Sequence, residues 1–498
     1  AGVGSVMSSF NIVDGIPATA NKWLLTDVLR DEWGFQGLLV TDYNSIAEMA
    51  VHGVAPLEEA SVRALQAGTD MDMVSCGFLN TLEESLKEGK VTEAQINTAC
   101  RRVLEAKYKL GLFADPYKYC DTLRVEKELY TADHRAAARE IAAKTFVLLK
   151  NEKNLLPLEE KGKIALIGPM ADARNNMCGM WSMTCTPSGH GTLLEGIRSA
   201  AGDKAEILYA KGSNVYYDEE MEKGAVGIRP LERGNDRQLL AEALRTAARA
   251  DVIVAAVGEC AEMSGEFPSR TNLEIPDAQQ DLLKALVKTG KPVVVVCAAG
   301  SAVNTECAPD ALIHAWYPGS EGGTALAEIL FGDVSPSGKL PVTFYEKSEL
   351  LPEFTDYSMK NRTYRFAENN VLYPFGFGLT YGDIVCTSVE YKDGSAVVSA
   401  ENKGKNATED VIELYIKDYS ENAVTNVSLC GFKRISLDAG EKVTVTIPVP
   451  ERAFTAVDEK GERKRFGSRF TLYAGTHQPD AISETLCGNK CAVTEINL

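Results

Sequence analysis

A short apolar run that ends abruptly in a carboxylate is the feature that most constrains the fold of this chain. The run Gly37-Leu38-Leu39-Val40-Thr41 is followed directly by Asp42 and Tyr43. Such a run is typical of a buried parallel strand, and functional side chains gather at the carboxyl ends of these strands in barrels and open α/β sheets. The sequence therefore predicts an α/β fold with Asp42 as a candidate functional residue. The alternative interpretation is a strand-end aspartate that caps the next helix.

Length and composition set the broad class. The chain has 498 residues, and roughly two to four domains are expected at this length. Its hydrophobic content of 45% and charged content of 24% are ordinary for a soluble globular protein. No apolar run approaches the roughly 18 residues of a membrane span, so no transmembrane helix is expected. The net charge of -18, without a basic cluster, argues against nucleic-acid and anionic-membrane partners.

The 12 cysteines are scattered along the chain. Cys297 lies in an apolar segment and Cys100 in a predicted helix, positions typical of buried free thiols. Cys487 and Cys491, with three residues between them, indicate a turn or a local disulfide rather than a zinc site. Free thiols favour a reducing, cytoplasmic location, with a secreted or periplasmic location as the alternative.

Residues 1–115 alternate predicted strands and helices in the manner of a βα barrel. A complete barrel needs roughly 200 to 250 residues, so this segment has room for less than half of one. Either the first half of the barrel is lacking, or another chain supplies it. The predicted strands are residues 3–10 and 37–41, and the predicted helices are residues 21–33, 79–89 and 92–109. Residues 57–66 and then 67–73 are interpreted as a third βα-like unit.

After a connector over residues 116–145, the pattern changes to short apolar strands separated by helices. Apolar strands with intervening helices indicate a mostly parallel sheet covered on both faces, and residues 146–345 are expected to form such an α/β sandwich. The predicted strands are residues 163–168, 251–257, 292–297 and 311–317, and the predicted helices are residues 236–248, 278–288 and 324–331.

The last third of the chain is rich in strands. Residues 346–385 are irregular and are interpreted as a linker. From residue 386 to 498, segments such as 411–416 and 442–449 alternate apolar and polar side chains in the β manner. A β-sandwich is therefore expected for residues 386–498.

Several motifs carry a resemblance to one enzyme family. Residues 4–46, which include Val6-Met7-Ser8-Ser9-Phe10-Asn11 and Asp14-Gly15-Ile16-Pro17-Ala18, resemble the catalytic barrel of glycoside hydrolase family 3, the exo-acting β-glucosidases and β-xylosidases. Pro318-Gly319-Ser320-Glu321-Gly322-Gly323 and residues 332–341 resemble later signatures of that family. Residues 373–381 resemble its lead into a fibronectin type III-like domain.

This resemblance spans nearly all of the chain in family order. It implies the C-terminal part of a (β/α)8-type barrel in residues 1–115, then the α/β sandwich and a fibronectin type III-like domain. It implies no cofactor and no metal. The sugar-holding residues that the family carries in the first half of its barrel have no counterpart in this sequence.

The resemblance also assigns the nucleophile. In this family the aspartate that ends the barrel-strand motif attacks the sugar, and that position is Asp42 here. Retaining glycosidases need a second carboxyl group, which donates a proton to the leaving oxygen and then activates water. The two groups must converge in three dimensions, so no spacing within one motif reveals the pair.

Three glutamates after the predicted strand 251–257 are candidates for this acid/base, namely Glu259, Glu262 and Glu266. In the family the acid/base follows Ser-Gly, and Arg and then Asn-Leu come shortly after it. Ser264-Gly265-Glu266 and Arg270-Thr271-Asn272-Leu273 match that pattern. The resemblance therefore implies Glu266, and the alternative is that Glu259 or Glu262 acts instead.

Three aromatic residues are candidates for substrate binding. Phe10 occupies a position where the family often has tyrosine; it can stack but cannot supply the hydroxyl group, so the detailed sugar contacts differ. Tyr43 follows the nucleophile and is a candidate for the pocket wall. Trp181 is a candidate stacking platform, and a packed core tryptophan is the alternative.

The resemblance implies a retaining, exo-acting β-glycoside hydrolase, foremost a β-glucosidase that acts on small oligosaccharides or aryl glycosides. The alternatives are a β-xylosidase or arabinofuranosidase, or a non-catalytic carbohydrate-binding subunit that needs a second chain to complete the site. An incomplete barrel exposes strand edges and apolar surface. A complementing chain or a homo-oligomer is therefore expected to cover it.

Overall fold

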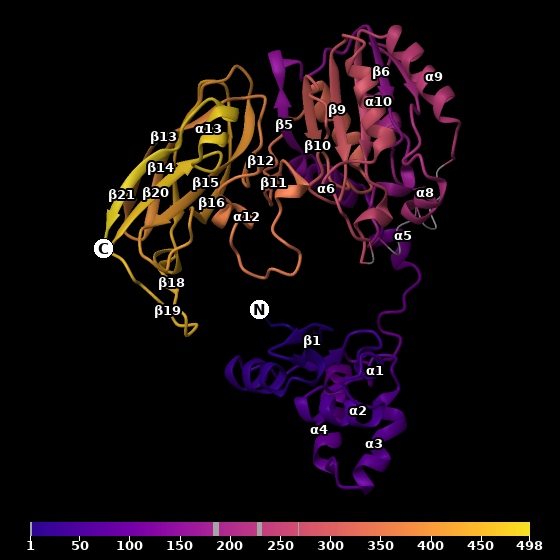
Figure 1. Cartoon of the computed structure of the whole chain (residues 1–498), viewed down its shortest axis with the longest axis vertical. Helices are drawn as coiled ribbons and strands as arrows, with labels where there is room; N and C mark the ends of the chain where they lie inside the picture. The colour runs from indigo at the N-terminus through magenta and orange to yellow at the C-terminus, as the bar shows by residue number, and fades with distance from the viewer. Residues whose placement is uncertain (1, 183–188, 227–231, 267) are drawn as a thin grey trace. The chain divides into compact units, whose positions relative to one another are not determined.

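The computed structural model describes residues 2–182, 189–226, 232–266 and 268–498. The chain divides into two compact units, Ala1–Leu129 and Tyr130–Leu498 (Figure 1). Across the described ranges, no helix combines the length and the apolar character that crossing a membrane requires.

The first unit contains a short parallel sheet surrounded by helices. Strand β1 (Ser5–Ser8) pairs with β4 (Leu38–Thr41), and Met71 extends the parallel pairing through a bridge to Val40. This is the βα arrangement that the sequence predicts. The other elements of the unit are β2 (Ile12–Val13), β3 (Ile16–Pro17), η1 (Ala18–Ala20), the π-helix η2 (Trp23–Glu32), α1 (Ser45–Val51), α2 (Leu57–Ala67), α3 (Gly77–Lys87), α4 (Glu93–Lys109) and α5 (Arg124–Glu128).

Local sequence signals fix these helices. Helix α4 begins at a capping box, in which the Thr92 hydroxyl accepts from the Gln95 amide and the Gln95 side chain accepts from the Thr92 amide. Helix α2 ends at Gly68, whose left-handed backbone conformation terminates it. Its buried Ala60 and Ala64 pack with Ile46 of α1 in the core of the unit.

The second unit is built on a six-stranded sheet in the order β5-β10-β9-β8-β6-β7. Five strands run parallel, and β5 at one edge is antiparallel to β10. The sheet is therefore mostly parallel, as expected. The strands are β5 (Val147–Asn151), β6 (Lys163–Ile167), β7 (Glu206–Ala210), β8 (Val252–Gly258), β9 (Val293–Ala298) and β10 (Ala311–His314).

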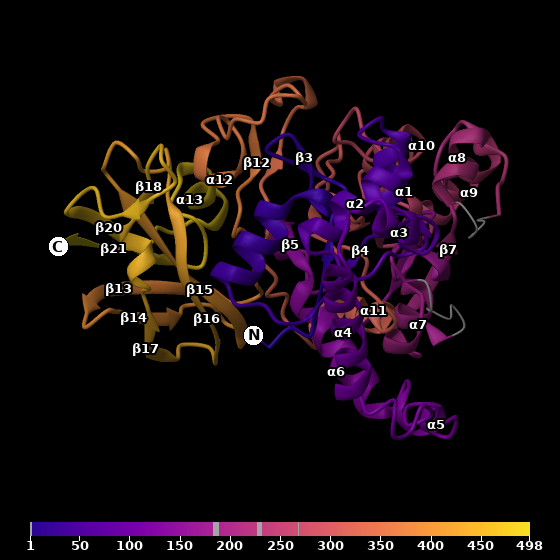
Figure 2. The same cartoon turned by 90° about the horizontal axis from the view of Figure 1, so that it is seen from below.

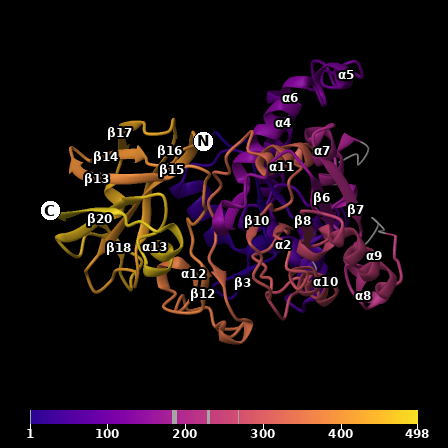
Figure 3. The same cartoon turned by 90° about the horizontal axis from the view of Figure 1, so that it is seen from above.

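Helices cover both faces of this sheet (Figure 3). One face packs against α6 (Ala132–Thr145), α7 (Leu193–Ala201) and α11 (Gly322–Phe331). The other face packs against α9 (Asp236–Ala248) and α10 (Asp277–Val287). Alternate residues of each central strand enter the two cores, so these strands are apolar throughout. Helices α8 (Glu219–Val226) and α9 lie at the β7 end of the sheet (Figure 2).

A segment with little regular structure leads from the sheet to a β-sandwich. It contains β11 (Phe344–Tyr345), α12 (Thr363–Phe366) and β12 (Val371–Tyr373). The sandwich has a three-stranded sheet, β13-β14-β17, and a four-stranded sheet, β16-β15-β20-β21. Its strands are β13 (Ile384–Lys392), β14 (Ser395–Asn402), β15 (Thr408–Asp418), β16 (Ser428–Leu437), β17 (Lys442–Pro448), β20 (Arg469–Gly475) and β21 (Ala492–Asn497).

The cysteines of the described residues are free thiols. Cys297 is buried as expected, whereas Cys100 is exposed on α4. Cys487 ends α13 (Ala481–Cys487), and Gly488 turns the chain there in the left-handed conformation. The turn expected at Cys487 is therefore present, and the local disulfide to Cys491 is not formed.

Candidate active site

Asp42 lies directly after the last residue of β4, at the carboxyl end of the strand. Its side chain is half-buried and its Oδ1 accepts a hydrogen bond from the Tyr43 amide at 2.6 Å. The N-cap of α1 is Asn44, and no side chain caps that helix. The interpretation of Asp42 as a helix cap is therefore wrong.

A chain of buried hydroxyl groups fixes the elements around Asp42. Thr19 Oγ1 lies 2.9 Å from Ser8 Oγ at the end of β1 and 2.7 Å from Ser45 Oγ at the start of α1. All three residues are at most 3% exposed. Buried polar networks of this kind restrict local motion when each member is satisfied. They hold the carboxyl ends of β1 and β4 in one arrangement.

Phe10 and Tyr43 lie in the same unit as Asp42, and both present large exposed surfaces. Phe10 is 46% exposed and Tyr43 is 64% exposed. Tyr43 is adjacent to Asp42 in sequence, and Phe10 lies two residues beyond the end of β1. Rings that are not packed in the core of their own unit are free to contact another molecule.

Glu266 lies in the second unit, on the loop that follows β8. The loop begins with the short helix η6 (Ala261–Ser264), and Glu266 beyond it is exposed. The amide of Ala261 donates to Asn176 Oδ1 at 2.9 Å, and Tyr317 donates its hydroxyl to the Cys260 carbonyl at 2.8 Å. The start of the loop is therefore anchored while Glu266 remains accessible.

Glu259 is fully buried, which sets it apart from Glu266. Its Oε2 accepts hydrogen bonds from Ser264 Oγ at 2.9 Å and from the Ser301 amide at 3.0 Å, and its Oε1 lies 2.5 Å from Arg270 Nη2. A carboxylate occupied in this way cannot reach a substrate. Glu259 instead joins both ends of the loop that carries Glu266, a role that the sequence did not predict.

Trp181 is 68% exposed, so the alternative of a packed core tryptophan is wrong. The preceding residue, Met180, contacts the Glu266 loop at Gly265, where an added Cβ would overlap the Met180 sulfur. The structure therefore places the segment that carries Trp181 against the loop that carries Glu266. Glu266 and Trp181 thus lie in the second unit, whereas Asp42, Phe10 and Tyr43 lie in the first.

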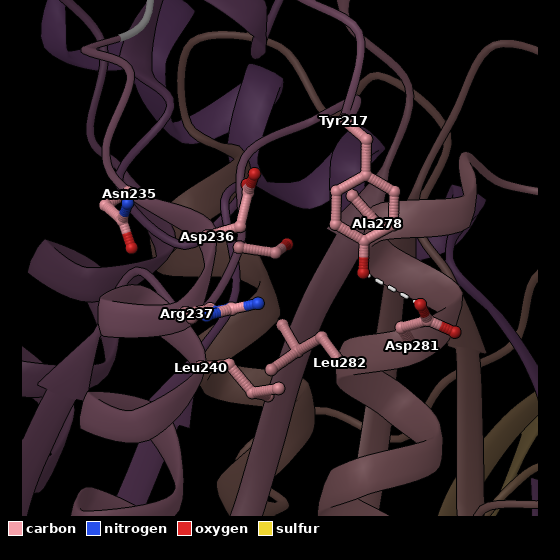
Figure 4. Close-up of a pocket in the computed structure, with 10 residues that line it drawn as sticks. Tyr217, Asn235, Asp236, Arg237, Leu240, Ala278, Asp281 and Leu282 are labelled. Carbon is pink, nitrogen blue, oxygen red and sulfur yellow. Dashed lines mark hydrogen bonds between the residues drawn. The ribbon is translucent and has the colours of Figure 1, made fainter.

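A separate cavity of about 490 Å³ lies beyond the end of β7, between α9 and α10 (Figure 4). Tyr217 donates its hydroxyl to Asp281 Oδ2 at 2.8 Å across one side of it. Burial, followed by this hydrogen bond, raises the pKa of Tyr217 to about 12. Asp236 and Arg237 face this cavity from α9. None of the five site residues predicted from the sequence lines it.

Comparison with known protein families matches three segments of the chain. Residues 1–106 match the glycosyl hydrolase family 3 N-terminal domain, and residues 146–381 match the glycosyl hydrolase family 3 C-terminal domain. Residues 410–478 match a fibronectin type III-like domain. The chain belongs to glycoside hydrolase family 3.

Two curated relatives illustrate the similarity. A periplasmic beta-glucosidase of Salmonella typhimurium is 38% identical, over 95% of this chain and 66% of its own length. A beta-xylosidase of Formosa agariphila is 34% identical, over 90% of this chain and 64% of its own length. The chain thus spans slightly less than two thirds of the length of each of these relatives.

Solved structures agree in fold. A β-glucosidase from Erythrobacter marinus superimposes with a TM-score of 0.84 at 31% identity, covering 99% of this chain and 67% of that one. The β-glucosidase from Listeria innocua in complex with isofagomine has a TM-score of 0.83 at 29% identity, covering 100% of this chain and 68% of that one. The cytoplasmic location favoured by the free thiols has no support from these comparisons, because the Salmonella relative is periplasmic.

Proposed function

We propose that this chain carries the two catalytic carboxyl groups of a retaining, exo-acting β-glycoside hydrolase. The observation that carries the proposal is the accessible carboxyl group of Glu266 on a loop whose two ends are anchored through Glu259. Asp42, at the carboxyl end of β4, is the second group, in the position where barrel enzymes hold catalytic residues. Family membership supports the pairing.

In this proposal Asp42 attacks the anomeric carbon while Glu266 donates a proton to the leaving oxygen. A covalent glycosyl-enzyme forms, and Glu266 then removes a proton from the water that hydrolyses it. The mechanism requires the two carboxyl groups to lie about 5 to 5.5 Å apart. Phe10, Tyr43 and Trp181 would contact the sugar, since their side chains are exposed.

We propose a terminal β-glucoside as the substrate, in a small oligosaccharide or an aryl glycoside. The relatives named above include β-glucosidases and a β-xylosidase, so xylosides are the second candidate. Hydrolysis of p-nitrophenyl β-D-glucoside and β-D-xyloside by the purified chain distinguishes the two. Asp42→Ala should lower either activity by at least about 10⁴-fold. The exposed carboxylate variant Asp31→Asn is the control and should remain active.

We further propose that additional polypeptide completes the barrel in the active protein, from a complementing chain or a second copy. The described sheet of the first unit has strands β1 and β4 only, whereas a closed barrel has eight. A groove of about 1000 Å³ lies at the amino ends of β1 and β4 and is lined by Val6, Trp33 and Phe35. Intact mass and light scattering on the active sample test this. If a folded chain is inactive by itself, a carbohydrate-binding subunit becomes the better description.

We also propose a periplasmic or secreted location, in keeping with the Salmonella relative. Fractionation of cells that express the full-length protein tests this. Recovery of the protein with cytoplasmic markers would contradict it.

A further inference from the structure

Another cleft lies far along the chain from the proposed catalytic groups, entirely within the second unit. It has a volume of about 580 Å³, which is in the range of sites for small molecules. One wall is the segment 343–374, and the other is formed by the β-sandwich. We call it the linker cleft. The residues that line it include Thr343, Glu368, Lys417, Tyr419, Tyr473 and Gln478.

Hydrogen bonds hold the two walls of the linker cleft together. Asn426 of the sandwich donates through its side chain to the carbonyls of Tyr364 and Ala367, at 2.9 and 2.7 Å. The Leu429 amide donates to the Tyr364 hydroxyl at 3.1 Å. The cleft is therefore a preformed feature of the fold.

Two buried polar side chains in this cleft lack partners. Thr343 and Gln478 are each 7% exposed, and both line the cleft. Neither Thr343 Oγ1 nor Gln478 Oε1 has a hydrogen-bond partner among the described residues. A buried polar group without a partner costs stability, so two such groups at one cleft indicate a polar ligand.

The other side chains of the linker cleft define what that ligand is. Tyr419 and Tyr473 supply aromatic surface with polar edges. The lining carries more negative than positive charge: three carboxylates, of Glu346, Glu368 and Asp480, against the one ammonium group of Lys417. Carboxylates only accept hydrogen bonds, so the cleft suits a ligand rich in hydroxyl donors and disfavours an anion.

We propose that the linker cleft is an accessory binding site for a neutral oligosaccharide. Sugar hydroxyls can donate to Gln478 Oε1 and accept from the Thr343 hydroxyl, which satisfies both unpaired groups. Tyr419 and Tyr473 cover an apolar face of a sugar ring. Neither Asp42 nor Glu266 lines the linker cleft, and the proposal does not depend on their roles.

Calorimetric titration of the whole chain with cellotetraose and xylotetraose tests the proposal. The Asp42→Ala background is used, so that the ligand is not consumed. Thr343→Val and Gln478→Met should each weaken binding about 2- to 10-fold, the effect of one neutral hydrogen bond. Neither variant removes a hydrogen bond within the protein, so the melting temperature should not fall.

Thr446→Val is the matched control, because Thr446 is an exposed residue of β17 in the β-sandwich and does not line the linker cleft. Glu368→Lys tests the class of ligand: it removes one exposed acceptor for sugar hydroxyls and should weaken binding of a neutral saccharide only about 2- to 10-fold. A combined Thr343→Val and Gln478→Met change that leaves both the number and the affinity of the saccharide sites unchanged would overturn the proposal. Binding of tetralysine with no binding of either saccharide would also overturn it, in favour of a basic peptide.

Discussion

Arg270 and Glu259 form an ion pair across the base of the loop that carries Glu266, with 2.5 Å between Nη2 and Oε1. Glu259 is fully buried, whereas the Arg270 side chain is 23% exposed. Breaking a buried pair leaves one charge uncompensated, which is costly. The pair therefore determines where Glu266 can lie.

We predict that Glu259→Gln slows hydrolysis of glycosides with poor leaving groups about 10²-fold, the scale of a 1 Å misplacement of a catalytic group. The amide keeps the shape of the side chain but loses the charge that faces Arg270. Proton donation by Glu266 suffers most when the leaving group needs that proton. Rates with alkyl glucosides and with 2,4-dinitrophenyl glucoside, measured side by side, check this dependence.

Glu262→Gln is the matched control for this experiment. Glu262 lies in the same loop, is half-buried and forms no ion pair in the described part of the chain. Its substitution should change rates by about twofold or less. Equal losses for all leaving groups in Glu259→Gln would mean that Glu259 supports the fold without positioning Glu266.

Gly265→Ala should also lower activity, by pushing away the segment that carries Trp181. An added Cβ would overlap the Met180 sulfur, although the backbone of Gly265, at φ -91°, is open to alanine. Met180→Ala removes the obstructing side chain. The double variant is therefore expected to recover activity relative to Gly265→Ala, and such coupling is measured by a double-mutant cycle. Additive losses would contradict this contact.

The central part of the fold could be predicted from the sequence because its strands are apolar on both faces. The expected strands at 163–168 and 251–257 match β6 and β8 closely, and helix α9 has the expected bounds. Edge strand β7 was missed, because half-exposed strands alternate and give a weaker signal. The antiparallel direction of β5 was also missed, since it depends on pairing with distant β10.

The candidate site was predictable in part because β8 is a recognisable apolar strand. The three candidate glutamates lie in the loop after this strand, but the burial of each one depends on partners far along the chain. Glu259 is held by Ser301, 42 residues away, and no local pattern reveals that contact. The exposure of Trp181 likewise depends on how its loop packs against Gly265.

The pH dependence of stability should contain a contribution from Glu413. Burial raises the pKa of Glu413 from 4.5 to about 7, while Lys339 and the Tyr415 hydroxyl, 2.7 Å away, act in the opposite direction. The folded chain therefore keeps a proton that the unfolded chain loses near pH 4.5. Stability from this group is complete below that pH and falls by about 3 kcal/mol as the pH rises to about 7.

Glu413→Gln should remove this dependence, because an amide does not titrate and can still accept from Tyr415. The difference in melting temperature between Glu413→Gln and the native chain should therefore be more positive at pH 8 than at pH 5. The comparison is made between variants, because the pKa of buried His314 is lowered to about 3 and its effect on stability runs the other way. Exposed Glu421→Gln is the control, and an equal shift there would contradict the assignment.

The Asp70 carboxylate is expected to stabilise the first unit, so its substitution should lower the stability of that unit. It is buried between Arg30 Nη2 at 2.7 Å and Arg102 Nη1 at 2.8 Å, and it also accepts from the Leu39 amide in β4. Burial lowers the pKa of Arg30, and the Asp70 carboxylate opposes that change.

Asp70→Asn leaves the buried Arg30 guanidinium without its counter-charge, which should cost about 3 to 5 kcal/mol. Hydrogen exchange of β4 should then accelerate, while strand β9 of the second unit serves as the internal reference. Because Asp42 follows β4 directly, loosening this strand should also reduce activity. Exposed Asp31→Asn is the matched control, and unchanged exchange in β4 of Asp70→Asn would show that the two arginines do not depend on this carboxylate.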